Sequence, residues 1–163
     1  MDKAGFKGIF DEYYNPLKNF LYYKLGDIDL AEDLTQEVFL KTWNNRDEIR
    51  VETVKSYLYT IANNLAINHY RSARNRFEFG LKNEDSEHQQ SPQYKMEEAE
   101  FEEHLKVSIG QLTENQRIVF LMNRIDDLTY KEIAERLEIS VKAVEKRMHK
   151  ALEFLRQAIE HKI

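Results

Sequence analysis

Residues 129–150 read TYKEIAERLEISVKAVEKRMHK, and their capping and apolar patterns set the architecture of the C-terminal part of the chain. Thr129 and Glu132 have the spacing of a capping box, in which the hydroxyl and the carboxylate satisfy backbone N–H groups at a helix start. Ser140 is a typical N-cap for a second helix. Only two residues separate it from Leu137, the last apolar residue of the first helix. Two helices joined by so short a turn predict a helix-turn-helix.

The second of these helices is expected to be amphipathic. Its apolar stripe consists of Val141, Val144, Met148, Leu152, Leu155 and Ile159. The opposite side carries Lys142, Glu145, Lys146, His149 and Lys150. In a helix-turn-helix, the early residues of the second helix enter the DNA major groove while flanking Lys and Arg pair with phosphates.

This arrangement makes the second helix a candidate for reading DNA. We predict that Glu145, Lys146 and His149 face base edges, because Glu accepts from cytosine N4 and Lys donates to guanine O6 and N7. Arg147 and Lys150 are expected to hold the DNA backbone. The alternative interpretation is a solvated, charged helix surface.

Upstream of the helix-turn-helix, the same module has two further expected helices. Thr113 and Gln116 form a second capping box, and residues 96–111 form an acidic helix before it. Residues 78–95 (EFGLKNEDSEHQQSPQYK) lack helical apolar periodicity and are rich in Glu, Gln, Ser and Asn. Such a segment cannot bury enough surface to offset its ordering entropy, so it predicts a flexible linker between two modules.

The N-terminal module shows three amphipathic segments, at residues 6–25, 29–44 and 53–77. Asp29 stands three residues before Glu32 and is the predicted N-cap of the second segment. With little Pro and Gly in the chain, these patterns predict an all-α protein of two small helical domains.

Two helix faces of this module are candidates for function. The second segment exposes Asp33, Gln36, Glu37 and Leu40, a mixture of acid and apolar groups that suits docking on a partner helix bearing Arg. The third exposes Thr60, Asn64, Asn68, Arg71 and Asn75, and its basic C-terminal end also carries Arg74. Amides beside cations suit bases read singly with phosphates held nearby. For both faces the alternative is ordinary surface polarity. The aromatic side chains of Trp43, Tyr57, Tyr59 and Tyr70 could stack on bases, and the alternative for them is core packing.

Amino-acid composition bears on three questions: whether the chain can bind DNA, whether it holds a metal or catalytic site, and whether it enters a membrane. The net charge of −5 is uneven: residues 78–104 carry −7 while residues 105–163 carry +2, so an acidic total does not exclude a DNA partner. No cysteine is present and the histidines form no metal-binding pair, so we expect neither a cofactor nor a metal and no catalytic site. The sequence has no apolar run long enough to insert into a membrane and no secretory signal, which predicts a cytoplasmic protein.

Three segments together resemble bacterial extracytoplasmic-function (ECF) sigma factors: residues 31–43 (AEDLTQEVFLKTW), 56–71 (SYLYTIANNLAINHYR) and 112–117 (LTENQR), followed by the helix-turn-helix. The resemblance implies sigma region 2 in residues 1–77, a linker in residues 78–95 and sigma region 4 in residues 96–163. It implies a protein that directs promoter-specific transcription initiation.

The same resemblance implies partners and residue roles. Core RNA polymerase would bind the Asp33, Gln36, Glu37 and Leu40 face. Promoter DNA would be contacted at its −10 element by Asn64, Asn68, Arg71 and Arg74, with the loop at residues 44–51 capturing a flipped base. The −35 element would meet Lys142, Glu145, Lys146, Arg147, His149 and Lys150. An anti-sigma factor is a further expected partner. The rival hypotheses are a stand-alone helix-turn-helix regulator and a helical adaptor that binds only proteins.

Overall fold

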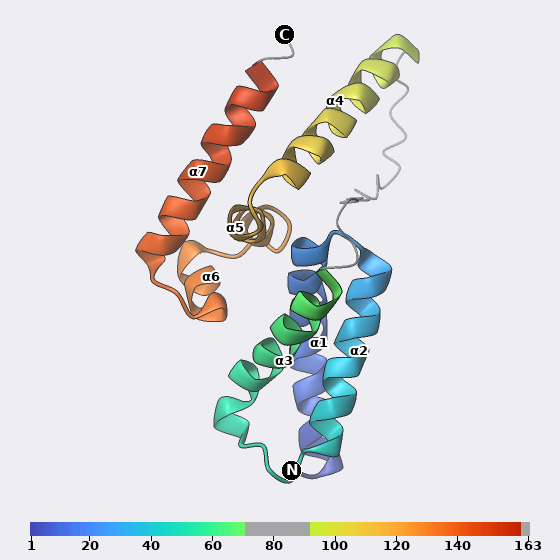
Figure 1. The fold of residues 1–163 in the computed structure, drawn as a ribbon, viewed down its shortest axis with the longest axis vertical. Coiled ribbons are helices and arrows are strands. Elements are labelled where there is room, and N and C mark those ends of the chain that lie inside the picture. The colour runs from blue at the N-terminus through green and yellow to red at the C-terminus, as the bar shows by residue number, and fades with distance from the viewer. Residues whose placement is uncertain (71–91, 161–163) are drawn as a thin grey trace. The chain divides into compact units, whose positions relative to one another are not determined.

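The structure, a computed structural model, describes residues 1–70 and 92–160. The chain divides into two compact units, Met1–Arg76 (unit 1) and Phe77–Ile163 (unit 2). All regular elements in the described ranges are helical (Figure 1). The sequence prediction of an all-α, two-domain protein is therefore confirmed.

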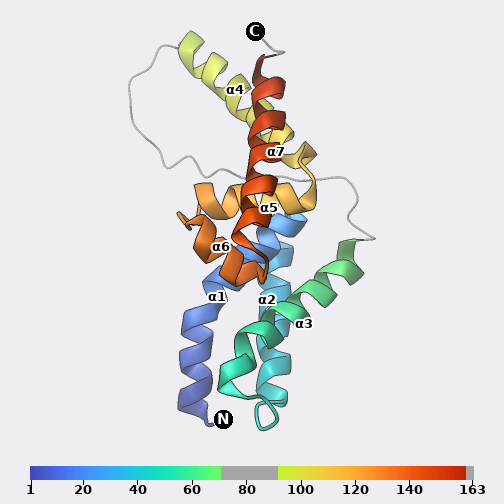
Figure 2. The same cartoon turned by 90° about the vertical axis from the view of Figure 1, so that its left-hand side faces the viewer.

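Unit 1 is a small bundle in which α1 (Lys3–Leu25) and α2 (Ile28–Asn44) lie side by side and α3 (Val54–Tyr70) packs across both of them (Figures 1 and 2). The 3-10 turn η1 (Val51–Thr53) leads into α3. Apolar residues at helical spacing fill the space between the three helices. The most deeply buried include Leu17, Leu21, Tyr23, Leu34, Val38, Leu58 and Ala62.

The turn between α1 and α2 corrects one prediction. Gly26 ends α1 with a φ of 75°, a left-handed conformation that a residue without Cβ adopts readily. Asp27 follows in extended conformation, and its carboxylate accepts a hydrogen bond from the Leu30 N–H at 3.1 Å. Asp27, and not Asp29, is therefore the N-cap of α2. Asp29 lies in the first turn of the helix instead.

Aromatic side chains join α1 to α2 near the N-terminus. Phe39 makes ring contacts with Phe6 and Phe10, and Trp43 packs edge-on against Phe6 with ring centroids 4.9 Å apart. On the other side of the bundle, Tyr59 of α3 packs on Phe20 at 5.2 Å. Trp43 and Tyr59 are thus parts of the packing within unit 1, as the core interpretation of these aromatics predicted.

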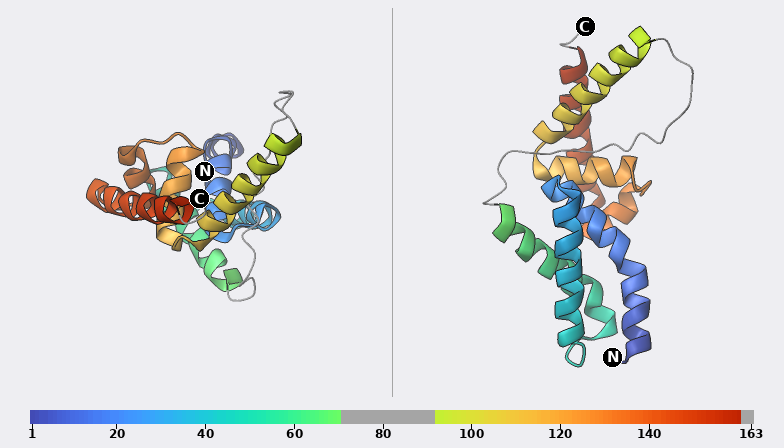
Figure 3. Two further views of the ribbon diagram at one scale, coloured as in Figure 1. Left: turned by 90° about the horizontal axis from the view of Figure 1, so that it is seen from above. Right: turned by 90° about the vertical axis from the view of Figure 1, so that its right-hand side faces the viewer.

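Unit 2 is built on its longest described helices, α4 (Pro92–Gln111) and α7 (Val141–Glu160). The shorter α5 (Glu114–Arg124) and α6 (Tyr130–Leu137) both pack on α7, and α4 contacts α7 as well (Figure 3). The core combines residues from all four helices, among them Ile109, Val119, Met122, Ile133, Val144, Met148 and Ala151. A polar contact also ties α4 to α7, because His104 Nε2 lies 2.8 Å from the Ala158 carbonyl oxygen.

Three helix starts in unit 2 are as predicted. Both capping boxes form: the N–H groups of Gln116 and Glu132 donate to the hydroxyls of Thr113 and Thr129, and each side chain accepts from the threonine N–H in return. The third cap is Ser140, whose Oγ accepts from the N–H of the third residue of the helix at 3.0 Å. These caps depend only on neighbours in sequence, so local pattern finds them.

Two details of unit 2 differ from the expectation. Helix α4 begins at Pro92, inside the segment predicted as linker, because proline at the first helical position loses no hydrogen bond. Val141 is 41% exposed and does not belong to the buried stripe, which starts one turn later at Val144. The remaining linker residues, 78–91, lie outside the described part, as does residue range 71–77 of the third predicted helix.

Candidate nucleic-acid and partner-binding interfaces

The outward face of α2 presents the mixed surface that the sequence predicted. Asp33, Gln36 and Leu40 are exposed, and Leu40 has 61% of its surface open to solvent. Glu37 is half-buried and lies 3.8 Å from the Nζ of Lys41, an exposed i, i+4 ion pair of small energetic weight. The opposite face of α2 supplies the core residues Leu34 and Val38, so the orientation of this surface is fixed by burial.

Helix α3 exposes its polar row. Thr60, Asn64 and Asn68 are all exposed, whereas Leu58 and Ala62 on the opposite side are fully buried. The amides are therefore held on a rigid helix and point away from unit 1. Arg71 and Arg74, the two cations predicted at the end of this face, lie outside the described residues, as does Asn75.

The segment between α2 and η1 is anchored to its neighbours. The Arg46 guanidinium lies over the Trp43 ring, 4.0 Å from its centroid, and donates to the Trp43 carbonyl oxygen at 2.9 Å. Asn45 donates through Nδ2 to the Tyr57 hydroxyl at 3.4 Å. These contacts tie the loop to α2 on one side and to the start of α3 on the other.

The first turns of α7 carry the charged face of unit 2. Val144 and Met148 are buried beneath it, which turns the opposite side of the helix to solvent. The exposed residues on that side are Lys142, Glu145, Lys146, His149 and Lys150. All of the residues predicted to read bases are thus accessible on one helix.

Arg147 occupies a different position from its neighbours. It is half-buried and, with Lys146 and Lys150, lines a hollow of about 370 Å³. The other wall is the start of α5, with Thr113, Asn115 and Gln116. Cations facing the N-terminal end of a helix favour an anion between them, and a DNA phosphate has the required charge.

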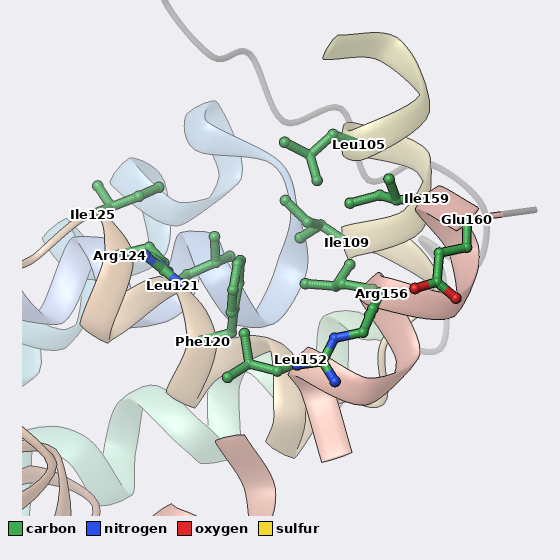
Figure 4. A pocket seen from close by; sticks show the side chains of 11 residues that line it. Leu105, Ile109, Phe120, Leu121, Arg124, Ile125, Leu152, Arg156, Ile159 and Glu160 are labelled. Carbon is green, nitrogen blue, oxygen red and sulfur yellow. The ribbon is translucent and has the colours of Figure 1, made fainter. Parts of the chain in front are cut away.

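A larger groove in unit 2 was not predicted. It has a volume of about 610 Å³ and lies between α4, α5 and α7 (Figure 4). Its apolar lining consists of Leu105, Ile109, Phe120, Leu121, Ile125, Leu152, Leu155 and Ile159. Arg124, Arg156 and Glu160 complete the lining with charged groups. The only sequence signal was the continuation of the α7 stripe beyond the part that α6 covers.

Two other kinds of site have no counterpart in the described ranges. Across residues 1–70 and 92–160, no group of His, Asp and Glu side chains has a geometry that could hold a metal ion. Within the same ranges, none of the helices combines the length and the apolar character needed to span a bilayer.

Comparison with known proteins matches the two units to two regions of one protein family. The family model for sigma-70 region 2 matches residues 9–76, and the model for sigma-70 region 4 matches residues 104–155. Bacillus subtilis sigma factor YlaC is 29% identical over 148 residues, covering 88% of this chain and 85% of that protein. The ECF sigma factor SigW of the same organism is 28% identical over 169 residues, covering 97% of this chain and 90% of that protein.

A solved structure shares the fold. The sigma factor RpoE from Bartonella quintana, crystallised with the anti-sigma factor NepR, matches with a TM-score of 0.60 at 19% identity, covering 95% of this chain and 96% of that one. The two helical units, which match sigma-70 region 2 and sigma-70 region 4, define a protein of the sigma-70 type. The chain belongs to the sigma-70 family of RNA polymerase sigma factors, in its extracytoplasmic-function group.

Proposed function

We propose that this chain binds core RNA polymerase and directs it to promoters, with residues 1–77 acting at the −10 element and residues 96–163 at the −35 element. Residues 78–95 connect the two. One observation carries the proposal: a single chain exposes an amide row on α3 and a cationic recognition helix, α7, each supported by its own core. Sigma factors are transcription initiation factors and not enzymes, and this chain acts through binding alone.

At the −10 element, α3 reads bases that have left the duplex. Asn64 and Asn68 are fixed on a rigid helix, and amides of this kind form paired hydrogen bonds with base edges. Arg71 and Arg74 hold the neighbouring phosphates. The loop that Arg46 anchors to Trp43 precedes α3 in the chain and receives an extruded base. Extrusion costs a few kcal/mol, which contacts to the flipped base offset.

At the −35 element, α7 enters the major groove of duplex DNA. Glu145, Lys146 and His149 read base edges, while Lys142, Arg147 and Lys150 bind phosphates. The hollow between Arg147 and the start of α5 seats one phosphate and fixes the depth of the recognition helix.

Protein partners bind elsewhere on the chain. Core polymerase docks on the α2 face of Asp33, Gln36, Glu37 and Leu40, where an exposed leucine sits among acids. Because the RpoE structure of similar fold was solved with an anti-sigma factor, we infer an anti-sigma partner for this chain as well. The apolar groove of unit 2 offers either partner a second contact. From these proposed partners we also infer a cytoplasmic protein.

Reconstituted transcription tests the proposal. Core polymerase with the wild-type chain should produce run-off transcripts from a promoter that core polymerase alone ignores. Asn64→Ala should lose promoter opening and keep polymerase binding, whereas Leu40→Asp should lose polymerase binding itself. Both positions are exposed, so neither change disturbs the core.

Two results would contradict the proposal. A chain that fails to co-purify with core polymerase, but binds duplex DNA tightly by itself, is a stand-alone helix-turn-helix regulator. Equal transcription by the wild type and Asn64→Ala removes α3 from promoter opening.

A further inference from the structure

Ile67 is an apolar residue in the middle of a polar helix face. It is 49% exposed and lies on α3 between the exposed residues Asn64 and Asn68. Nine residues, or two and a half helical turns, separate it from the buried Leu58, so these two side chains leave the helix on opposite sides. Thr60, seven residues earlier, lies on the same side as Ile67. Ile67 therefore does not belong to the edge of the core.

Scattered apolar residues are common on protein surfaces and most need no explanation. The placement of those in unit 1 is informative, however. Besides Ile67, the large exposed apolar side chains among residues 1–69 are Phe10, Ile28, Leu40 and Val51. Leu40 and Val51 belong to the polymerase-binding face and the base-capturing loop that we proposed above. Ile67 has the same relation to the amide row of α3.

The chemistry of DNA bases supplies a partner for such a side chain. Base edges present mainly polar groups, and the C5-methyl group of thymine is the one methyl group among them, which proteins read by apolar contact. Helical neighbours three residues apart have Cβ atoms about 5–6 Å from each other, so Asn64 and Ile67 reach adjoining parts of one nucleotide or of two successive ones. An isoleucine beside hydrogen-bonding amides can thus add a methyl contact to their readout.

We propose that Ile67 is a specificity-determining residue that contacts the C5-methyl group of a thymine in the −10 element. The inference rests on the proposed function, because it requires α3 to face the bases of that element. It assigns to this chain a preference for thymine at one −10 position that the amides alone do not create.

The test removes the methyl group from the DNA and the isoleucine from the protein. Holoenzyme reconstituted from core polymerase and the wild-type chain is bound to a promoter fragment that it opens, with each −10 thymine replaced in turn by deoxyuridine. This change deletes only the methyl group. We expect one position at which affinity falls about fourfold, the ratio that corresponds to burial of one methylene-sized group.

Ile67→Ala should abolish that difference. Holoenzyme with Ile67→Ala should bind the thymine fragment about fourfold more weakly than the wild type does. It should bind the deoxyuridine fragment no more weakly than the thymine fragment, so that the double-mutant cycle shows full coupling between Ile67 and the methyl group. The exposed position and the good helix propensity of alanine keep α3 folded, which circular dichroism verifies. Ile28→Ala, at the 41% exposed start of α2, is the matched control and should retain the wild-type ratio.

The proposal is overturned if the wild type binds thymine and deoxyuridine fragments equally at every −10 position, or if Ile67→Ala keeps the wild-type ratio. Failure of the proposed function looks different: the wild-type holoenzyme then opens no promoter fragment, and both proposals fall together.

Discussion

Helices α3 and α7 are both amphipathic, but the side chains that they expose differ in charge. Each buries one side against its own unit and turns the opposite side outward, yet the polar row of α3 consists of uncharged side chains beside an isoleucine, whereas residues 141–150 of α7 expose five ionisable groups. A cationic face gains from the dense charge of duplex DNA, and its binding weakens as salt rises. The described part of the α3 face is uncharged and depends on contacts with individual bases, and the cations that we propose for phosphate binding, Arg71 and Arg74, follow it in the sequence. The contrast agrees with our proposal that α7 attaches to duplex DNA and that α3 reads single bases.

The largest expected effect comes from removing a core side chain that supports α7 in unit 2. Ile133 of α6 is fully buried, and Ile133→Ala should destabilise unit 2 by about 2–5 kcal/mol, through lost apolar burial and the cavity that remains. Because the two units have separate cores, the amides of α3 should keep their protection against hydrogen exchange while those of α7 lose it. Leu58→Ala in α3 is the reciprocal variant, and loss of protection in both units by either change would refute separate cores.

Substitutions that remove a lysine from α7 test the difference between the two helices with a smaller expected effect. Lys146→Ala should weaken binding to the −35 element by about 1–3 kcal/mol and relax the preference at one base pair. Lys150→Ala should weaken binding to all sequences alike and reduce the salt slope by about 1. Asn64→Ala should leave the salt slope unchanged. Filter binding at several salt concentrations measures the DNA affinity of each variant and its dependence on salt. Equal salt slopes for all three variants would contradict the proposed roles of α3 and α7.

The two capping boxes of unit 2 provide a pH comparison. Thr129 donates its backbone N–H and hydroxyl to Glu132, at 3.2 and 3.0 Å, and these bonds lower the pKa of Glu132. The depressed pKa means that the carboxylate form stabilises α6 at neutral pH and that this contribution is lost as the pH falls through the lowered pKa. The box of α5 uses Gln116, which has no charge to lose.

Acid titration followed by thermal melting tests this difference. Thr129→Ala and Thr113→Ala should each cost about 1 kcal/mol at neutral pH. Only the Thr129→Ala penalty should shrink in acid, because only its partner is a carboxylate. Glu132→Gln should remove the pH dependence of α6 and leave its cap in place. A penalty at Thr113 with the same pH dependence would exclude Glu132 as the cause.

The smallest expected effect concerns the turn that positions α7. Glu138 ends α6 with a φ of 56°, a conformation in which a side chain costs free energy that glycine avoids. Glu138→Gly should therefore raise the stability of unit 2 by roughly 0.5–1 kcal/mol, measured by denaturant unfolding. Glu135→Gly, in the interior of α6, is the control and should destabilise by a similar amount. A loss of stability at position 138 would show that its side chain outweighs the strain.

What could be predicted from the sequence is what depends on near neighbours. The caps at Thr113, Thr129 and Ser140 are local, and the exposed faces of α2 and α3 follow from helical periodicity. The N-cap of α2 was missed because the choice between Asp27 and Asp29 depends on where α1 ends, at Gly26.

The groove of unit 2 was missed for a different reason. No single helix carries its pattern, since Leu105, Phe120 and Leu152 come from three helices and meet only after packing. Val141 shows the converse: its spacing fits the apolar stripe, but it is 41% exposed in the first turn of α7. The roles of individual residues on the exposed faces likewise depend on partners and not on the chain itself.

The position of Trp43 gives the molecule a built-in optical reporter. It is the only tryptophan of the chain, and its indole sits at the end of α2 between Phe6 and Arg46. Its emission therefore reports on the folding of unit 1 without any added label. Since Arg46 of the loop that we propose captures a base lies over the same indole, binding of a nucleotide there is expected to change its quantum yield.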